Sequence, residues 1–209
     1  MVNGCAGAGE GWRVVPDVGL AAAELGTGPT VVFANDSSNS VCAWLPIART
    51  LAAGDHVRVV LFTYYDFSEQ RSVDDMLALA RKVSRTSRYA LVGASLGGRL
   101  VIECAAQHPA GLAAIVSLSG ERMIQPGYPD VLPQARRVIS PALYIGSSED
   151  PLTDGSRQPT DLHRAMRGRP NELLQLIGFD HGTDLLELPT SDGHTVSDRI
   201  ADFLRSQLA

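Results

Sequence analysis

The sequence has few cysteines, and they follow no recognisable spacing. Cys5, Cys42 and Cys104 are the three cysteines among 209 residues. They are odd in number, far apart and form no Cys-x-x-Cys pair, so we expect neither a disulfide framework nor a cysteine-based metal site. A reducing compartment is the simplest interpretation, and it predicts a cytoplasmic protein.

Long apolar runs and an excess of basic residues are also missing. No apolar stretch approaches the length of a membrane span, and the N-terminus lacks the basic and apolar segments of a secretory signal. The formal net charge of −5 gives no reason to expect nucleic acid or a membrane surface as a partner. The length and the 44% hydrophobic content favour one globular domain over 12–209, preceded by a loose tail over 1–11.

Short apolar runs alternate with helical patterns over most of the chain. Such alternation predicts an α/β fold with a mostly parallel central sheet and helices on both faces. The stretch 20–25 could form an edge strand or a helical turn. The segment 119–140 is irregular, with one short helical turn at most. Strands are predicted over 12–15, 20–25, 30–33, 57–63, 89–92, 113–118, 142–146 and 172–177, and helices over 41–53, 72–86 (with Ser72 as N-cap), 99–108, 160–168 and 195–207.

The strongest chemical signal is Gly93-Ala94-Ser95-Leu96-Gly97, which lies between a predicted strand and a predicted helix. In that context the G-x-S-x-G pattern indicates a nucleophile elbow, a sharp turn that projects the serine hydroxyl above the sheet edge. Gly93 and Gly97 lack side chains, which would collide in such a turn. The backbone N–H of Leu96, at the start of the helix, would face a negative oxygen formed next to Ser95.

A serine hydroxyl needs a base to take its proton, and the best placed histidine is His181. Ligands of a parallel sheet bind beyond the carboxyl ends of its strands, and His181 directly follows the last predicted strand. The other four histidines fall on helices or at the opposite edge of the sheet. They are His56, His108, His163 and His194.

The base in turn needs a carboxylate that fixes its tautomer. Asp150 follows the predicted strand 142–146, and Pro151 stiffens its loop. Glu149 is the neighbouring alternative, and Asp180 is another because it directly precedes His181.

Three motifs in this order resemble the α/β-hydrolase superfamily. They are the elbow around Ser95, the acid loop around Asp150 and the histidine loop around His181. The resemblance extends from about Thr30 to the C-terminus, and it implies a single-domain α/β-hydrolase fold. Because 119–140 is short, the chain resembles a compact, nearly lidless member with no large cap domain.

By the same resemblance, the backbone N–H of Ser37 is the second oxyanion donor, with Asp36 as the alternative register. The chain departs from the family here, because Asn35-Asp36 stands where members often carry His-Gly. A carboxylate that pointed toward a developing oxyanion would oppose it.

The resemblance implies a serine hydrolase that cleaves a carboxylic ester or thioester through an acyl-enzyme, with no metal and no cofactor. An acyltransferase or peptidase on the same residues is the alternative, and so is a non-catalytic binding module. The expected partner is a small-molecule acyl substrate; the oligomeric state is left open. Aromatic and apolar residues on the loops near the site could line an acyl pocket or form the edge of the core. They are Trp44, Tyr64, Tyr65, Phe67, Met123, Tyr128 and Phe179.

Overall fold

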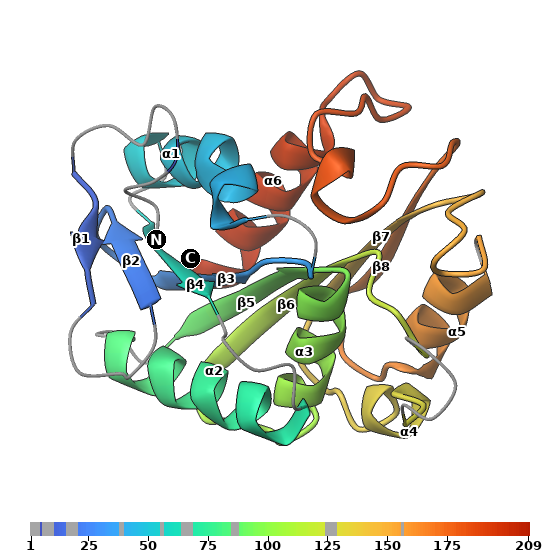
Figure 1. Ribbon diagram of the computed structural model, residues 1–209, viewed down its shortest axis with the longest axis horizontal. Helices are drawn as coiled ribbons and strands as arrows, with labels where there is room; N and C mark the ends of the chain where they lie inside the picture. Colours follow the sequence, from blue (N-terminus) through green and yellow to red (C-terminus); the bar gives the residue numbers. More distant parts are fainter. Residues whose placement is uncertain are drawn as a thin grey trace.

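A central sheet of eight strands organises the fold (Figure 1). The computed structural model describes residues 5, 11–15, 21–37, 40–54, 57–63, 69–84, 88–123, 129–155 and 157–209. The strand order is β1-β2-β4-β3-β5-β6-β7-β8, in which the β1–β2 and β2–β4 pairs are antiparallel and all pairs from β4 to β8 are parallel. The strands are β1 (Arg13–Val14), β2 (Ala21–Leu25), β3 (Thr30–Ala34), β4 (Arg58–Thr63), β5 (Tyr89–Ala94), β6 (Leu112–Leu118), β7 (Ala142–Ser147) and β8 (Asn171–Leu176).

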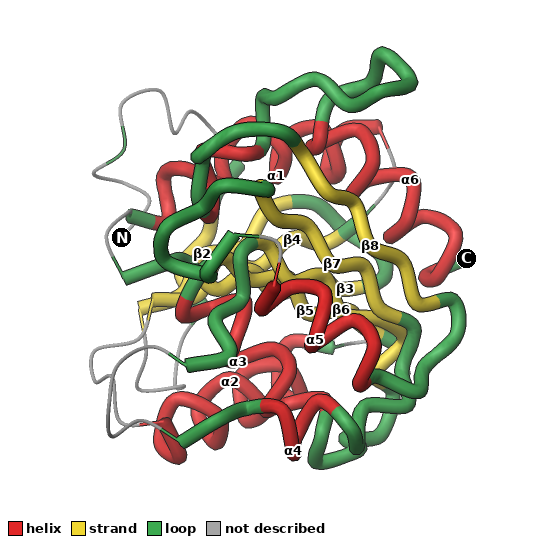
Figure 2. The backbone as a smooth tube through the Cα atoms, turned by 90° about the vertical axis from the view of Figure 1, so that its right-hand side faces the viewer, coloured by secondary structure: helices red, strands yellow, loops and turns green. Residues whose placement is uncertain are grey.

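Helices cover both faces of the sheet, as the sequence predicts (Figures 1 and 2). Helices α1 (Leu45–Gly54) and α6 (Val196–Leu208) pack on one face. The other face carries α2 (Glu69–Val83), α3 (Leu96–Ala105), α4 (Leu132–Ala135) and α5 (Arg157–Ala165). None of the helices in the described residues is long and apolar enough to cross a membrane.

Strand β3 shows why the sheet is buried on both sides. Successive side chains of a strand point to opposite faces. Val31 and Phe33 accordingly belong to the core beneath α1 and α6, whereas Val32 and Ala34 belong to the core beneath α2 and α3. All four are fully buried, which explains why the strand is a continuous apolar run without alternating polar residues.

The predicted helices are confirmed, with shifted boundaries. The first begins as a 3-10 turn at Val41–Trp44, capped by the Ser40 hydroxyl, before α1 starts. Ser72 is not an N-cap, because α2 begins three residues earlier, at Glu69. Glu, Gln and Arg at 69–71 favour helix and extend it upstream. Helix α5 lies over Arg157–Ala165 instead of 160–168.

Two cysteines are paired, contrary to the expectation from the sequence. Cys5 and Cys42 form a disulfide, and the third cysteine, Cys104, is buried and free. The pair is separated by 37 residues, but the fold brings the two Cα atoms to 5.5 Å. Spacing along the chain could not show this approach. The expected tail over 1–11 lies largely outside the described residues, and Cys5 within it is buried.

Trp44 belongs to the hydrophobic core and not to a substrate pocket. Its side chain is 0% exposed, and its ring centroid lies 5.0 Å from that of Phe33. Aromatic pairs at this separation add to the stabilisation that burial provides. Of the two alternatives for Trp44, an acyl pocket or the edge of the core, the structure therefore favours the core.

We expect Trp44→Ala to lower the free energy of unfolding by about 3–5 kcal/mol, because it opens a cavity in a close-packed core. Phe179→Ala is the matched control, since the Phe179 side chain is 68% exposed. Its effect should stay within about 0.5 kcal/mol. Urea denaturation of both variants measures the difference. Equal losses of stability would contradict the assignment of Trp44 to the core.

Candidate functional site

Ser95 occupies a strained turn between β5 and α3. Its φ of 51° and ψ of −115° lie in a region that residues other than glycine rarely adopt. The Ser95 N–H donates to the Leu118 carbonyl at the end of β6, and the Arg99 N–H donates to the Ser95 carbonyl. Backbone hydrogen bonds on both sides of Ser95 therefore keep it in this strained conformation. The serine stands at the carboxyl edge of the sheet, as the elbow pattern predicts.

The glycines of the elbow are required by close backbone contacts. A Cβ atom on Gly97 would lie 2.5 Å from the Ala34 carbonyl oxygen, and one on Gly93 would overlap the Gly97 carbonyl. On Gly98, it would lie 2.9 Å from the Leu118 carbonyl oxygen. Strands β3, β5 and β6 thus approach the start of α3 as closely as glycine allows.

His181 and Asp150 form a hydrogen-bonded pair at the same edge. The Nδ1–H of His181 donates to Asp150 Oδ2 at 2.6 Å. Asp150 is 0% exposed, and its Oδ1 accepts the Leu152 N–H at 2.9 Å. Both carboxylate oxygens are therefore engaged, and the pairing leaves His181 Nε2 as the atom free to accept a proton.

None of the described alternatives for the acid or the base forms this pair. Glu149 and Asp180 are exposed, so neither replaces Asp150 as the buried partner of His181. His163 bonds the Asn171 carbonyl through Nε2. His108 and His194 are exposed, and His56 lies outside the described residues.

Glu121 also enters this site, although no sequence motif marks it. The Ser95 hydroxyl donates to Glu121 Oε1 at 3.0 Å, and Glu121 is 8% exposed. His181 Nε2 is buried and has no hydrogen-bond partner in the described part of the chain. Ser95 is therefore paired with Glu121 and not with the histidine. The signal in the sequence was position: Glu121 follows β6 by three residues, at the carboxyl edge of the sheet.

A second serine joins the histidine loop to β6. Ser119 is fully buried, has a φ of 47°, and accepts the Gly182 N–H through its hydroxyl oxygen at 3.0 Å. A Cβ on Gly182 would lie 3.7 Å from the Cβ of Ala94, so the residue after His181 lies beside the residue before Ser95. The histidine and serine loops are thus adjacent in space.

Three carboxylates surround the imidazole. Burial alone would lower the pKa of His181, but the hydrogen bond and charge of Asp150, with the charges of Glu121 and Asp36, raise it above the ordinary 6.5. Burial acts to raise the pKa of Asp150, yet the hydrogen bond and charge of His181 and further hydrogen bonds hold it below 3.8. Burial raises the pKa of Glu121, against the lowering effects of the Ser95 hydrogen bond and the charges of His181 and Arg99.

The predicted oxyanion donors lie on the expected loops. Leu96 begins α3 directly after Ser95, and Ser37 lies three residues beyond β3. The Asp36 side chain accepts from the Thr183 hydroxyl at 3.2 Å, so this carboxylate lies against the histidine loop. The donor roles of Leu96 and Ser37 stay predictions.

Of the remaining residues predicted to line a pocket, Met123 and Phe179 are described and exposed, at 45% and 68%. Neither is part of the buried core. Tyr64, Tyr65, Phe67 and Tyr128 lie outside the described residues.

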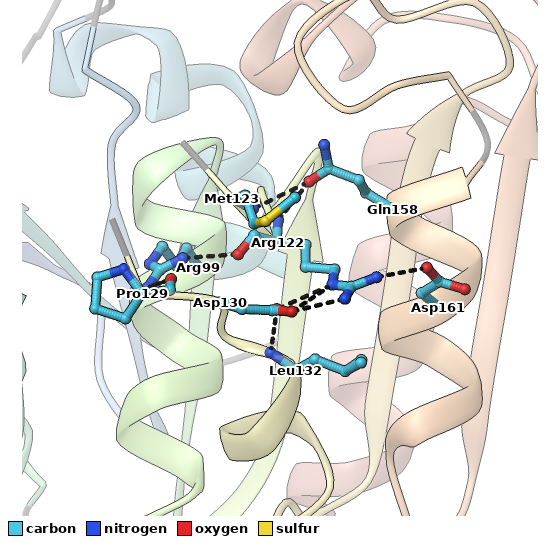
Figure 3. A network of polar contacts seen from close by, with 8 residues as sticks. All are labelled: Arg99, Arg122, Met123, Pro129, Asp130, Leu132, Gln158 and Asp161. Atoms are coloured by element: carbon cyan, nitrogen blue, oxygen red, sulfur yellow. Dashed lines mark hydrogen bonds and ion pairs between the residues drawn. The ribbon is translucent and has the colours of Figure 1, made fainter. Parts of the chain in front are cut away.

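The segment that follows Glu121 is held by a polar network (Figure 3). The Arg122 guanidinium binds both Asp130, at 2.6 Å, and Asp161 of α5, at 2.9 Å. The hydrogen bond from Arg122, with further contributions, lowers the pKa of Asp130 below its ordinary value. Gln158 Oε1 accepts the backbone N–H groups of Arg122 and Met123. The start of the 119–140 segment is thereby fixed to α5, and α4 is its single helix within the described residues.

Solved structures of similar shape share this arrangement of strands and helices. A monoacylglycerol lipase from Paleococcus ferrophilus is 15% identical, with a TM-score of 0.74 over 90% of this chain and 99% of its own. A dienelactone hydrolase from Anabaena variabilis is 16% identical, with a TM-score of 0.74 over 95% and 98%. The chain has the α/β-hydrolase fold. Est1E from Butyrivibrio proteoclasticus also shares it, at 13% identity and a TM-score of 0.70 over 95% and 99% of the two chains. No protein-family model and no curated protein sequence matches the chain.

The electrostatics predict an unusual titration of His181. We expect its imidazole to titrate above pH 6.5, and Glu121→Gln to lower that pKa, because the substitution removes a negative charge that favours the imidazolium. Glu149→Gln is the matched control and should leave the titration unchanged. NMR titration of the imidazole measures the pKa in all three proteins. A wild-type value at or below 6.5 would contradict this account.

Proposed function

We propose that the protein is a serine hydrolase that cleaves a carboxylic ester or thioester, with Ser95 as nucleophile, His181 as base and Asp150 as the residue that orients the base. The observation that carries the proposal is the strained turn at Ser95, at the same edge of an α/β-hydrolase sheet as the hydrogen-bonded pair of buried Asp150 and partly buried His181. The structures of similar shape include enzymes named as a lipase, an esterase and a hydrolase. At such low sequence identity, the similarity in shape shows the fold alone. The proposed activity therefore depends on the residues of the site.

The proposed reaction begins when the Ser95 hydroxyl turns from Glu121 toward His181 Nε2. Such hydrogen bonds often form only once substrate is bound. Ser95 Oγ then attacks the carbonyl carbon while Nε2 takes the hydroxyl proton, and Asp150 stabilises the resulting imidazolium. The N–H groups of Leu96 and Ser37 bind the oxyanion in this proposal.

The tetrahedral intermediate collapses when His181 returns its proton to the leaving alcohol or thiol, which departs and leaves an acyl group on Ser95 Oγ. A water molecule then attacks the acyl carbon while His181 again accepts a proton. When this second intermediate collapses, the bond between the acyl carbon and Ser95 Oγ breaks, His181 returns its proton to Ser95 Oγ, and the carboxylic acid is released.

Acyl transfer and peptide cleavage use the same three residues and remain the alternatives. One structure of similar shape is a proline iminopeptidase from Mycobacterium smegmatis, so amide cleavage occurs on this fold. A non-catalytic binding module would not need a buried carboxylate paired with the histidine, and the observed pair counts against it. A small-molecule acyl substrate remains the proposed partner.

The cytoplasmic location stays a prediction, and the Cys5–Cys42 disulfide counts against it. Disulfides persist mainly in oxidising compartments. The inference of a reducing compartment depended on unpaired cysteines, and two of the three are joined. Counting free thiols of the protein in cell extracts would distinguish a reduced Cys5 and Cys42, expected in the cytoplasm, from the disulfide.

Ser95→Ala should fold normally and lose nearly all hydrolysis of p-nitrophenyl esters, because no other hydroxyl occupies the elbow. A fluorophosphonate probe should label wild-type protein at Ser95 and leave the variant unlabelled. Peptide mapping by mass spectrometry locates the label. Labelling at another serine, or full activity in Ser95→Ala, would overturn the proposal.

Asp150→Asn should lower kcat by roughly 10³–10⁴-fold while the fold stays intact, because the amide favours the wrong histidine tautomer. Glu149→Gln is the matched control, an exposed neighbour on the same loop, and should retain activity close to wild type. Steady-state kinetics and circular dichroism of both variants make the comparison. The reverse order of effects would identify Glu149 as the acid.

A further inference from the structure

The Ser95–Glu121 hydrogen bond gives the site a third carboxylate at the reacting atom itself. Glu121 Oε1 lies 3.0 Å from Ser95 Oγ, and the residue is 8% exposed. In the described part of the chain, the Ser95 hydroxyl is the one hydrogen-bond donor that reaches this carboxylate. Any acyl group that binds to Ser95 must therefore lie next to Glu121.

Neighbouring contacts fix Glu121 in this place. The next residue is tied at its backbone by two groups: the Arg122 N–H donates to Gln158, and the Arg122 carbonyl accepts from the guanidinium of Arg99 at 2.9 Å (Figure 3). Arg99 is 1% exposed and also pairs with Glu103. The backbone beside Glu121 is thus anchored to both α3 and α5, so the carboxylate is positioned by the fold.

The proposed reaction deprives Glu121 of its donor. The hydroxyl proton of Ser95 must point at His181 Nε2 before attack, so it can no longer bind Glu121. A buried carboxylate that loses its hydrogen bond is strongly unfavourable. The bound substrate can remove this penalty if it presents a donor of its own at the same position.

We propose that Glu121 is a specificity-determining residue that selects acyl groups bearing a cationic N–H group on the carbon next to the carbonyl. This inference rests on the proposed function. Attack places the carbonyl carbon about 3–3.5 Å from Ser95 Oγ, so an atom two bonds further along the acyl group can reach Glu121 Oε1. The substrate ammonium then replaces the serine hydroxyl as the partner of Glu121 and frees that hydroxyl for His181.

The charges around the site also favour a cationic acyl group. Asp36, Asp150 and Glu121 face the imidazole, with exposed fractions of 2%, 0% and 8%. Besides His181, Arg99 is the cation whose charge acts on Glu121, and its guanidinium already binds Glu103 and two backbone carbonyls. An anionic acyl group would meet unscreened repulsion at this position, whereas a cationic one would be attracted.

Three p-nitrophenyl esters of nearly equal shape test the inference. The alanyl ester carries an ammonium group, the isobutyryl ester carries a methyl group in its place, and the methylmalonyl half-ester carries a carboxylate. After subtraction of spontaneous hydrolysis, wild-type kcat/KM should fall in that order, with the alanyl ester at least about tenfold ahead of the isobutyryl ester.

Glu121→Gln should reduce the ratio of alanyl to isobutyryl kcat/KM by about tenfold or more, since the amide keeps the shape and loses the charge. Glu149→Gln, which removes an exposed carboxylate nearby, should keep the wild-type ratio. Hydrolysis of the isobutyryl ester through Ser95 without any preference for the alanyl ester would overturn this inference and leave the proposed function standing. An unchanged ratio in Glu121→Gln would also overturn it. Hydrolysis of none of the esters would overturn both.

Discussion

The close approach of backbones at the elbow is the constraint on which the site depends. Gly97 leaves no room for a Cβ against the carbonyl of Ala34, and Gly98 leaves almost none against that of Leu118. Three parallel strands therefore meet the first turn of α3, and Ser95 is left at the top in a strained conformation. The strain is sustained because the sheet is buried on both faces and its backbone bonds are fixed. The polar side chains of the candidate site, those of Glu121, Asp150 and His181, come from loops that leave the same edge.

Those loops bring together Glu121 and the Asp150–His181 pair, the groups that would compete for the Ser95 hydroxyl in the proposed reaction. Glu121 comes from the loop after β6, and the Asp150–His181 pair comes from the loops after β7 and β8. In the free protein the Ser95 hydroxyl is bound to Glu121, while His181 Nε2 is buried without a described partner. If His181 acts as the base, as proposed, the Ser95 hydroxyl has two alternative hydrogen-bond partners, Glu121 and His181 Nε2. The balance between them depends on what else can bind Glu121.

The sequence allowed prediction of the fold class, most strands and the positions of Ser95, Asp150 and His181, because each follows a strand at the same edge. What it could not show depends on three-dimensional approach. Trp44 was predicted at a site-side loop, but sequence position does not tell which way a ring points, and it packs on Phe33. Cys5 and Cys42 are 37 residues apart in the sequence, and their pairing depends on an approach that only the folded chain provides. Glu121 belongs to an irregular segment with no motif, so only the fold reveals that it touches Ser95.

Glu121 also affects how negative charge near Ser95 can be stabilised. Its Oε1 lies 3.0 Å from Ser95 Oγ, so in the proposed reaction the carboxylate would lie close to where negative charge develops during attack on a carbonyl. Donors at the start of α3 can stabilise that charge, and Arg99 offsets part of the field of Glu121. The same Arg99 is already shared with Glu103 and with the backbone of the segment after β6, so its compensation is partial. The rest of the positive charge has to come from His181 once it is protonated, or from the molecule that binds.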